Sequence, residues 1–310
     1  MSNELCKPAW QTVADRIASR RAGLPIEQDA ETAAAELHGE IAPKGVLPAE
    51  QGWMAFAPMP TDLCRVSPFF PMGKNEMALA SRPFIRGMVI AKSAWGDVTY
   101  SGPKLSTFEE DLLLAVLALL KTVSPEDNAG RPTWTYRGPL RPILTALGYK
   151  TTGKRNYERV KAGLELLAMA VVRLQTKRGK WSITNMVAGA DGDDKDATIA
   201  VTVNPYFAEM YAAGSVNLLD LAKRAELSRP VSKALHRFAT SHRGEWRGHF
   251  LTLAAAINLD LEQPQKQIRR QISLAMAELR KTAVLSSRSK FSGDVVLLDP
   301  LGTSGKPLGV

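Results

Sequence analysis

Apolar residues recur along the chain in short periodic groups, and the order of these groups predicts the fold. Residues 84–90 and 97–101 alternate as strands on either side of a Trp-Gly-Asp turn, which predicts a β-hairpin. Ser106 then stands before three acidic residues and the apolar run 112–120, a pattern typical of a capped and buried helix. The folded part of the chain is therefore expected to open with a hairpin and a core helix.

The elements that follow complete one structural unit. They are a strand at 133–136, a helix at 138–147 that stops at Gly148, a basic helix at 154–170, strands at 171–176 and 181–187, and a strand at 197–203 after an acidic loop at 191–196. Helix, short strand, helix, basic helix and β-hairpin is the order of a winged helix, a helix-turn-helix variant with a β wing.

The same order recurs in the last third of the chain. Helices are expected at 218–224, 228–242, 253–258 and 265–282, with a short strand at 249–251 and a closing hairpin at 284–287 and 295–299. The predicted fold class is therefore α+β, with tandem winged-helix domains. The first domain is assigned to residues 76–205 and the second to residues 206–302, which leaves a tail at 303–310.

Residues 1–75 are expected to form a flexible N-terminal arm or linker. Two segments are compatible with short helices, at 10–21 and 30–37, and a stretch with six prolines follows them. Prolines at such spacing lack the backbone N–H groups that a regular element needs. The arm is therefore expected to lie outside both winged helices.

The helix expected at 265–282 combines a buried stripe with a basic face. The stripe consists of Ile268, Ile272, Met276 and Leu279, at helical spacing. The opposite face and its flanks carry Lys266, Gln267, Arg269 and Arg270. Arg and Lys can donate to guanine and Gln can bridge adenine, so this face suits the major groove of DNA. The alternative is an amphipathic helix whose basic face is solvated.

The helix expected at 154–170 has the same organisation. Its buried stripe is Val160, Leu164 and Leu167, while Lys154 and Arg155 project away from the stripe and Arg159 and Lys161 flank it. Gly153 precedes the helix and leaves room for a close approach to a phosphate. The first unit therefore also offers a DNA-contacting helix.

The net charge of +9 is concentrated in two blocks. Residues 131–181 hold twelve Lys or Arg and two acids, and residues 223–290 hold fourteen and five. Two basic blocks in an acidic background indicate two surfaces that face a polyanion, although solvated basic faces without a ligand remain an alternative. The predicted DNA-binding residues are those of the two helices and of the two wing turns: Lys154, Arg155, Arg159, Lys161, Lys177, Arg178, Lys180, Lys266, Gln267, Arg269, Arg270, Arg288 and Lys290.

Several other classes of protein are disfavoured by what the sequence contains. The longest apolar run is the nine residues 112–120, too short to cross a bilayer, and a basic-then-apolar leader is missing, so we expect a cytoplasmic protein without membrane contact. Two cysteines and four histidines lack metal-ligand spacing. No phosphate-binding Gly-rich motif occurs, and the acids of 191–196 fit a solvated loop. We therefore expect a protein that is not an enzyme, without catalytic residues, metal or cofactor, against the alternative of a relaxase or nucleotidyl transferase.

The sequence resembles the TrfA-type initiators of plasmid replication over about residues 59–299. The similar segments are Met59-Pro60-Thr61-Asp62, Val98-Thr99-Tyr100-Ser101-Gly102, Trp134-Thr135-Tyr136, Leu147-Gly148-Tyr149 and Phe238-Ala239-Thr240-Ser241-His242-Arg243. The resemblance implies two winged-helix domains that bind directly repeated double-stranded DNA (iterons) in a plasmid origin, open the origin and recruit host replication proteins, among them the host initiator and helicase. It also implies inactive dimers, active monomers and a part in plasmid copy control.

Two contacts with other chains follow from this resemblance. Gln51, Met54 and Phe56 fit the pattern of a peptide that docks on the host sliding clamp, against the alternative of a strand or linker that packs on the first domain. A dimer is expected through strands near 84–101 or 197–203. The competing function is a winged-helix transcriptional repressor or partition protein, because a fold does not fix a function.

Overall fold

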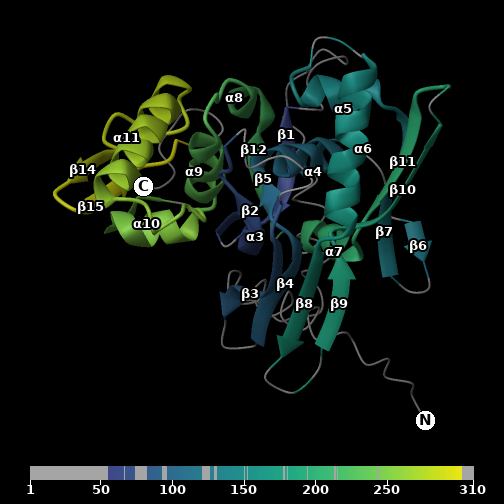
Figure 1. Cartoon of the computed structure of the whole chain (residues 1–310), viewed down its shortest axis with the longest axis horizontal. Coiled ribbons are helices and arrows are strands. Elements are labelled where there is room, and N and C mark those ends of the chain that lie inside the picture. Colours follow the sequence, from purple (N-terminus) through teal and green to yellow (C-terminus); the bar gives the residue numbers. More distant parts are fainter. Residues whose placement is uncertain are drawn as a thin grey trace.

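The computed structural model describes most of the chain from residue 55 to residue 301. The positions left out within that range are 66, 74–81, 93–95, 121–125, 129–130, 150, 152, 177–178, 180, 194, 213, 215 and 243. The described residues bury their apolar side chains in two clusters, one that ends at Leu221 and one that begins at Leu227. We therefore divide the described chain into a first unit, residues 55–221, and a second unit, residues 227–301, joined by a short connection (Figure 1).

The first unit combines helices with two four-stranded sheets. Its elements are β1 (Phe56–Pro60), α3 (Thr61–Arg65), β2 (Phe69–Phe70), β3 (Phe84–Lys92), β4 (Gly96–Pro103), β5 (Leu105–Ser106), α4 (Thr107–Leu120), β6 (Glu126–Asn128), β7 (Arg131–Pro139), α5 (Arg141–Ala146), α6 (Lys154–Ala168), β8 (Val171–Thr176), β9 (Trp181–Asn185), β10 (Val187–Asp193), β11 (Thr198–Val203), α7 (Pro205–Ala212) and β12 (Val216–Asp220). One sheet has the strand order β3-β4-β8-β9 and the other β10-β11-β7-β6.

The boundary predicted for the arm is wrong, because the first unit begins about twenty residues earlier. β1 pairs antiparallel with β12, and Ala57 and Met59 are fully buried in the first core. Prolines fit this strand because β1 has no partner on its other side among the described residues, so Pro58 and Pro60 need no N–H group for a second neighbouring strand. The earlier part of the arm, including the helices expected at 10–21 and 30–37, lies outside the described residues.

The core helix α4 begins as the sequence predicts. The Ser106 hydroxyl accepts a hydrogen bond from the Phe108 N–H at 3.1 Å, and the Glu109 carboxylate accepts one from the Ser106 N–H at 2.7 Å, which together form a capping box. Arg82 donates to both oxygens of Glu109, at 2.9 and 3.1 Å. The apolar run 112–120 is buried throughout, so α4 is the centre of the first unit.

The sheets of the first unit differ from the prediction in one respect. β10 runs to Asp193 and forms a hairpin with β11, so half of the expected acidic loop is strand. β11 pairs on its other side with β7, from Thr198↔Pro139 to Val203↔Trp134. Both edges of β11 are therefore occupied, and the expectation that a dimer forms along residues 197–203 is wrong.

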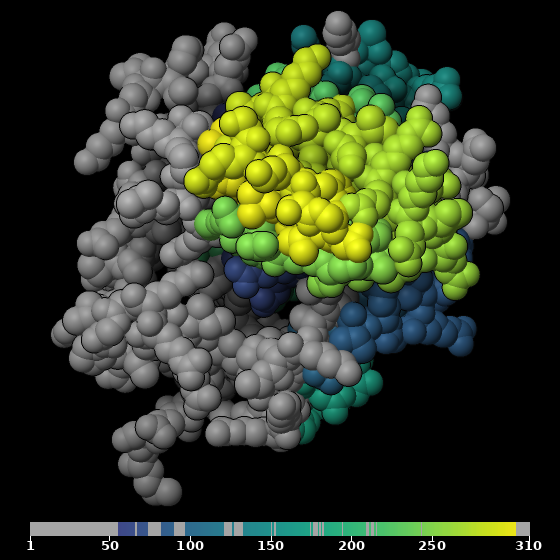
Figure 2. Space-filling model, turned by 90° about the vertical axis from the view of Figure 1, so that its left-hand side faces the viewer, coloured from purple at the N-terminus to yellow at the C-terminus, as the bar shows by residue number. Residues whose placement is uncertain are grey.

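The second unit is a smaller winged helix. Its elements are α9 (Pro230–Thr240), β13 (Trp246–His249), α10 (Phe250–Ala256), α11 (Gln265–Lys281), β14 (Lys290–Ser292) and β15 (Val295–Leu298), with strand order β13-β15-β14. Figure 2, which faces this unit, shows it in green to yellow as one continuous body in front of blue and teal parts of the first unit. The predicted order of elements is confirmed here, but the first strand of the closing hairpin lies at 290–292 rather than at the predicted 284–287.

The predicted boundary at residue 206 is also wrong. α7 and β12 belong to the first core, which includes Phe207, Tyr211 and Leu219. The helix expected at 218–224 is divided between β12 and the short helix α8 (Leu221–Ala225), whose start is capped by Asp220. The second unit therefore begins near Leu227 rather than at residue 206.

Charged side chains join the two units at a buried junction. On α4, Glu110 and Asp111 face three basic residues of α8 and α9: Arg224, Lys233 and Arg237. We call these five residues the junction cluster. In Figure 1, α9 lies between α11 and the centre of the first unit.

None of the helices in the described ranges is long and apolar enough to span a membrane.

Candidate nucleic-acid interface

The helix α6 is held against the first core by its predicted stripe. Val160, Leu164 and Leu167 are all buried. Gly163 lies where α6 meets α4, and a Cβ there would come within 2.7 Å of a Leu112 methyl carbon. The absence of a side chain at Gly163 therefore lets the two helices approach closely, which turns the opposite face of α6 outward.

The exposed beginning of α6 presents two of the predicted DNA-binding residues. Lys154 and Arg155 are exposed in its first turn, after an extended Gly153 that provides no side-chain cap. The preceding turn is ordered by Asn156, whose Nδ2 donates to the Thr151 carbonyl at 2.9 Å. This helix start therefore combines unoccupied N–H groups with two cationic side chains, a combination that attracts phosphate.

The other two predicted residues of α6 make contacts within the protein. The Arg159 guanidinium lies 4.2 Å from the centre of the Phe108 ring, a cation–π contact with α4. Lys161 lies 3.8 Å from Glu158 on the same helix. The first unit therefore offers its cations to a ligand from the beginning of α6 rather than along its whole length.

The helix α11 shows the predicted separation of faces. Ile268, Ile272, Met276 and Leu279 are buried in the second core. Lys266, Gln267 and Arg270 are exposed on its first half. Near its other end, the Glu278 carboxylate accepts hydrogen bonds from Ser228 and Ser232 at the start of α9. Partial burial raises the pKa of Glu278, but these hydrogen bonds outweigh it and hold the pKa below its ordinary value.

Arg269 differs from its predicted role as a DNA contact. Its guanidinium donates to the Asp294 carboxylate and to the Gly293 carbonyl at the tip of the wing. It also lies 5.1 Å from the ring centres of both Phe250 and Phe291. Because these contacts use the donors and the face of the guanidinium, Arg269 fixes the wing to α11 in this structure.

The wing of the second unit turns at Gly293 and Asp294, between β14 and β15. Arg288 and Lys290, which the sequence placed in the loop, lie before this turn, and Lys290 is the exposed first residue of β14. The Arg288 Nε donates to the buried Asp299 carboxylate at 2.9 Å. This hydrogen bond holds the pKa of Asp299 below its ordinary value. Lys290 therefore presents the wing's cation to a ligand more directly than Arg288 does.

The remaining predicted residues fall partly outside the description. Lys177, Arg178 and Lys180 of the first wing lie outside the described residues, as do Gln51 and Met54. Phe56 is described: it is half-buried at the start of β1, opposite Asp220. For Phe56 the structure matches the alternative stated above, a strand that packs on the first unit.

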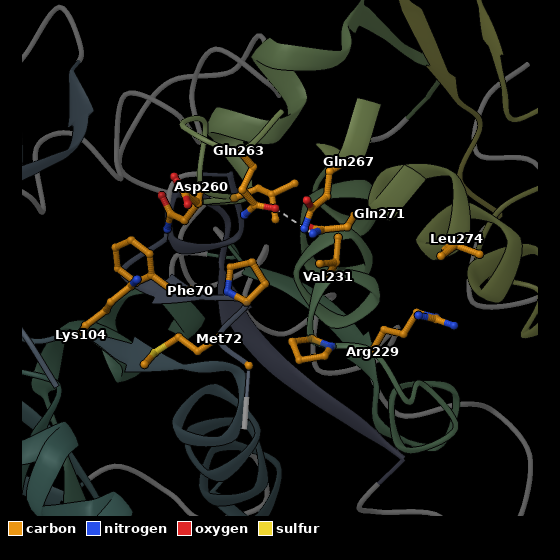
Figure 3. Close-up of a pocket in the computed structure, with 15 residues that line it drawn as sticks. Phe70, Met72, Lys104, Arg229, Val231, Asp260, Gln263, Gln267, Gln271 and Leu274 are labelled. Atoms are coloured by element: carbon orange, nitrogen blue, oxygen red, sulfur yellow. Dashed lines mark hydrogen bonds between the residues drawn. The ribbon is translucent and has the colours of Figure 1, made fainter. Parts of the chain in front are cut away.

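A pocket of about 630 Å³ lies between α11 and the first unit (Figure 3). Its lining includes Lys104 and Phe70 of the first unit and Gln267 and Gln271 of α11. The Gln271 Nε2 donates to the Gln263 Oε1 at 2.9 Å. The sequence prediction missed Lys104, because only the packing of one unit on the other brings it to the flank of α11.

The part of the chain that the structure describes contains no group of three or more His, Cys, Asp or Glu side chains that could hold a metal ion.

Comparison with known proteins identifies the first unit and its junction. Residues 96–240 match the family described as Initiator Replication protein, WH1. This part of the chain is similar to the WH1 domain of replication initiators. The match confirms the resemblance to plasmid replication initiators and the winged-helix fold class that the element order predicts. It runs through α6 and ends with α9, so the WH1 domain contains the junction cluster.

Two solved structures are similar to this chain over most of its length. A crystal structure of selenomethionine derivatives of domains 2 and 3 of RctB has 12% sequence identity and a TM-score of 0.49, and it covers 78% of this chain and 98% of that one. A second crystal structure of RctB domains 2–3 has 12% identity and a TM-score of 0.47, with 77% and 95% covered. No protein with a curated description matches the sequence.

Proposed function

We propose that this replication initiator binds directly repeated DNA of a plasmid origin, with both winged-helix units on one duplex. The observation that carries the proposal is the recurrence, behind the WH1 domain, of a second winged helix whose α11 exposes Lys266, Gln267 and Arg270. Two different basic helices in one chain favour an extended, asymmetric site over a palindrome.

The two helices contribute differently to this binding. α11 reads base edges, because amide and guanidinium groups on one exposed face match the donor and acceptor patterns of the major groove. The start of α6 positions the protein through phosphates, with Lys154, Arg155 and the first N–H groups of the helix. Lys290 adds a phosphate contact from the second wing.

The proposed role is not catalytic. Opening of the origin then depends on the free energy of DNA binding and on host replication proteins that the bound initiator recruits. The host initiator, the helicase and the sliding clamp are the proposed partners.

Self-association is proposed through the outer face of the β3-β4-β8-β9 sheet. Its inner face packs on the first core through Ile85, Met88, Val98 and Val172. The large apolar side chains Val89, Trp181 and Ile183 are exposed at 45%, 64% and 53%. Exposed apolar residues gathered on one sheet favour a contact with a second copy of the chain.

Selection from a pool of random-sequence duplexes tests the proposed DNA binding. We expect the full chain to select a two-part direct sequence, with protection of two major-groove segments per monomer in footprinting. Because cationic side chains release counterions from DNA, the logarithm of the affinity should fall steeply with the logarithm of the salt concentration. An affinity that is independent of salt would contradict DNA binding, and an inverted repeat with one protected segment per monomer would support the repressor alternative.

Sedimentation of a Trp181→Ser, Ile183→Ser variant tests the proposed dimer. We expect a larger monomer fraction than in the wild type at equal concentration, and tighter binding to the selected duplex. A matched control is Leu261→Ser, which changes a residue of the second unit that is 49% exposed. An unchanged dimer in the first variant would place the interface elsewhere.

A further inference from the structure

The junction between the two units contains a cluster of buried charges. The Glu110 carboxylate lies 2.6 Å from Arg237 and 3.1 Å from Arg224. Arg224 also donates to Asp111 at 2.6 Å and to the Lys233 carbonyl at 2.9 Å. Glu110 and Arg237 are fully buried and Arg224 is 2% exposed. One pair of neighbouring acids on α4 therefore holds both the connecting helix and the first helix of the second unit.

Such a junction resists sliding more strongly than an apolar one. Apolar burial is non-directional, because its free energy depends on the area removed from water rather than on the pairing of particular atoms. A buried carboxylate and a buried guanidinium lose their partners when the units rotate, and an unpaired buried charge is strongly unfavourable. The junction cluster therefore favours one orientation of the second unit over its neighbours.

A second set of hydrogen bonds connects the two units at another place. Asn258 follows α10 with a left-handed backbone, φ 56°, a conformation that Asn tolerates better than most residues. Its amide donates to the Ser67 carbonyl and, at 3.1 Å, to the Phe69 carbonyl of the first unit. Arg65 donates to the Ser241 carbonyl at 3.1 Å from the same side. Two separate sets of directional contacts thus fix both tilt and rotation.

We propose that the junction cluster sets the distance and rotation between α6 and α11, and thereby the spacing of base pairs that the protein accepts between its two DNA contacts. Glu110, Asp111, Arg224 and Arg237 are then positioning residues for sequence recognition, although they do not touch DNA. Each inserted base pair moves one contact by about 3.4 Å along the duplex and rotates it by about 34°. A rigid protein cannot follow such a change, whereas a hinged one can. The inference rests on the proposed function, because both units must bind the same duplex.

The chain offers a matched pair of variants for the test. Glu109 and Glu110 are neighbours on α4, both are buried, and both pair with arginine. Glu109 pairs with Arg82 inside the first unit, whereas Glu110 pairs across the junction. Glu109→Gln therefore controls for the loss of a buried carboxylate, and Glu110→Gln removes the negative charge that pairs with Arg224 and Arg237 across the junction.

The experiment measures binding of the full chain to the duplex selected from the random pool and to versions with two or five base pairs inserted between the two contacts. For the wild type and Glu109→Gln, we expect the insertions to weaken binding by about a hundredfold, the scale of avidity lost when two sites cannot be engaged together. For Glu110→Gln, we expect a penalty of about tenfold or less, with binding to a duplex that carries one contact unchanged within about twofold. Equal penalties in all three proteins, or equal relaxation by both variants, would overturn the inference.

A measurement without DNA keeps the inference testable if Glu110→Gln does not fold or no duplex is selected. Spin labels at Thr145 and Ala277, exposed residues of the first and second units, report the distance between the units when Cys6 is replaced by Ser. We expect a narrow distance distribution for the wild type and Glu109→Gln, and a broader one for Asp111→Asn. A distribution of unchanged width in Asp111→Asn would overturn the inference. Failure of the wild type to select any duplex would instead refute the proposed function.

Discussion

The two winged-helix units share an order of elements but differ in how their wings are attached. In the second unit β13, the strand that precedes α10, pairs with the wing strand β15, from Trp246↔Leu298 to His249↔Val295. In the first unit the corresponding strand, β7, pairs with β11. The wing strand β8 pairs with β4 on one side and with the other wing strand, β9, on the other side. The second unit is therefore a minimal DNA-binding module, whereas the first has extra sheet surface that can serve a protein contact.

The basic helices of the two units share one type of contact, between an arginine and an aromatic ring. Arg159 of α6 stacks on Phe108, and Arg269 of α11 lies against Phe250 and Phe291. In each case one arginine of the basic helix faces an aromatic ring of its own unit. The comparison shows that an arginine in a basic helix can serve packing as well as a ligand.

The largest expected effect concerns whether the two units are stable independently of each other. Arg237→Ala leaves Glu110 buried with one partner fewer, which should lower the free energy of unfolding by about 3–5 kcal/mol. Because the junction cluster joins the units, calorimetry should show both units destabilised together. A variant in which only the second unit melts earlier would mean that the first does not depend on the junction.

Acid is expected to destabilise the second unit directly, because the histidines among the described residues, at positions 236, 242 and 249, all belong to it. Burial, with the nearby charges of Arg224 and Lys223, lowers the pKa of His236 from 6.5 to about 3. The unfolded chain binds a proton there below pH 6.5 and the folded chain does not, so stability falls as the pH falls from 6.5 towards 3. The expected slope approaches about 1.4 kcal/mol per pH unit.

Urea denaturation at pH 7 and pH 5 measures this dependence. His236→Gln should lose less stability than the wild type between the two values, because glutamine does not titrate. Equal losses in both proteins would assign the acid sensitivity to other groups.

Base reading should distinguish α11 from the second wing. Arg270→Ala should weaken binding to the selected duplex by about 1–3 kcal/mol and relax the preference at one base position. Lys290→Ala should weaken binding to selected and random duplexes alike and reduce the salt slope by about 1. Titrations on both duplexes at several salt concentrations measure these differences, and equal losses on both for Arg270→Ala would show that α11 does not read that base.

The smallest effect expected is that of Arg159→Ala. Loss of an exposed cation–π contact should reduce stability by about 0.5–1 kcal/mol. Arg269→Ala should cost more, because that arginine also donates to Gly293 and Asp294. Thermal melts of the two variants decide the order, and a reversed order would mean that the wing of the second unit is held by other contacts.

Periodic patterns predicted much of this molecule correctly. The stripes of α6 and α11, the capping box at Ser106 and the left-handed Gly148 after α5 all follow from local spacing. The strand β1 could not be predicted in this way, because its prolines are permitted only by the absence of a second neighbouring strand in the described fold.

Net charge was a poorer guide to the binding surface. Of the basic residues in the block 223–290, Arg224 and Arg237 are buried, Lys233 belongs to the junction cluster, and Arg269 and Arg288 are paired with acids. A sequence shows the number of cations but not the distant carboxylates that neutralise them. Glu110 and Asp111, the acids that pair with Arg224, Lys233 and Arg237, lie more than a hundred residues earlier.

The ribbon formed by β1 and β12 has a consequence for synthesis of the protein. Phe56 pairs with Asp220, so the first strand must wait for its partner until more than 160 further residues have been translated. Until then Ala57 and Met59 have no strand beside them. The connection to the second unit follows β12 directly in the sequence, so it leaves the ribosome immediately after β12. Closure of the first unit and emergence of the second therefore coincide in time. A pause in translation once residue 220 has left the ribosome would give the nascent chain the interval in which to close this long loop.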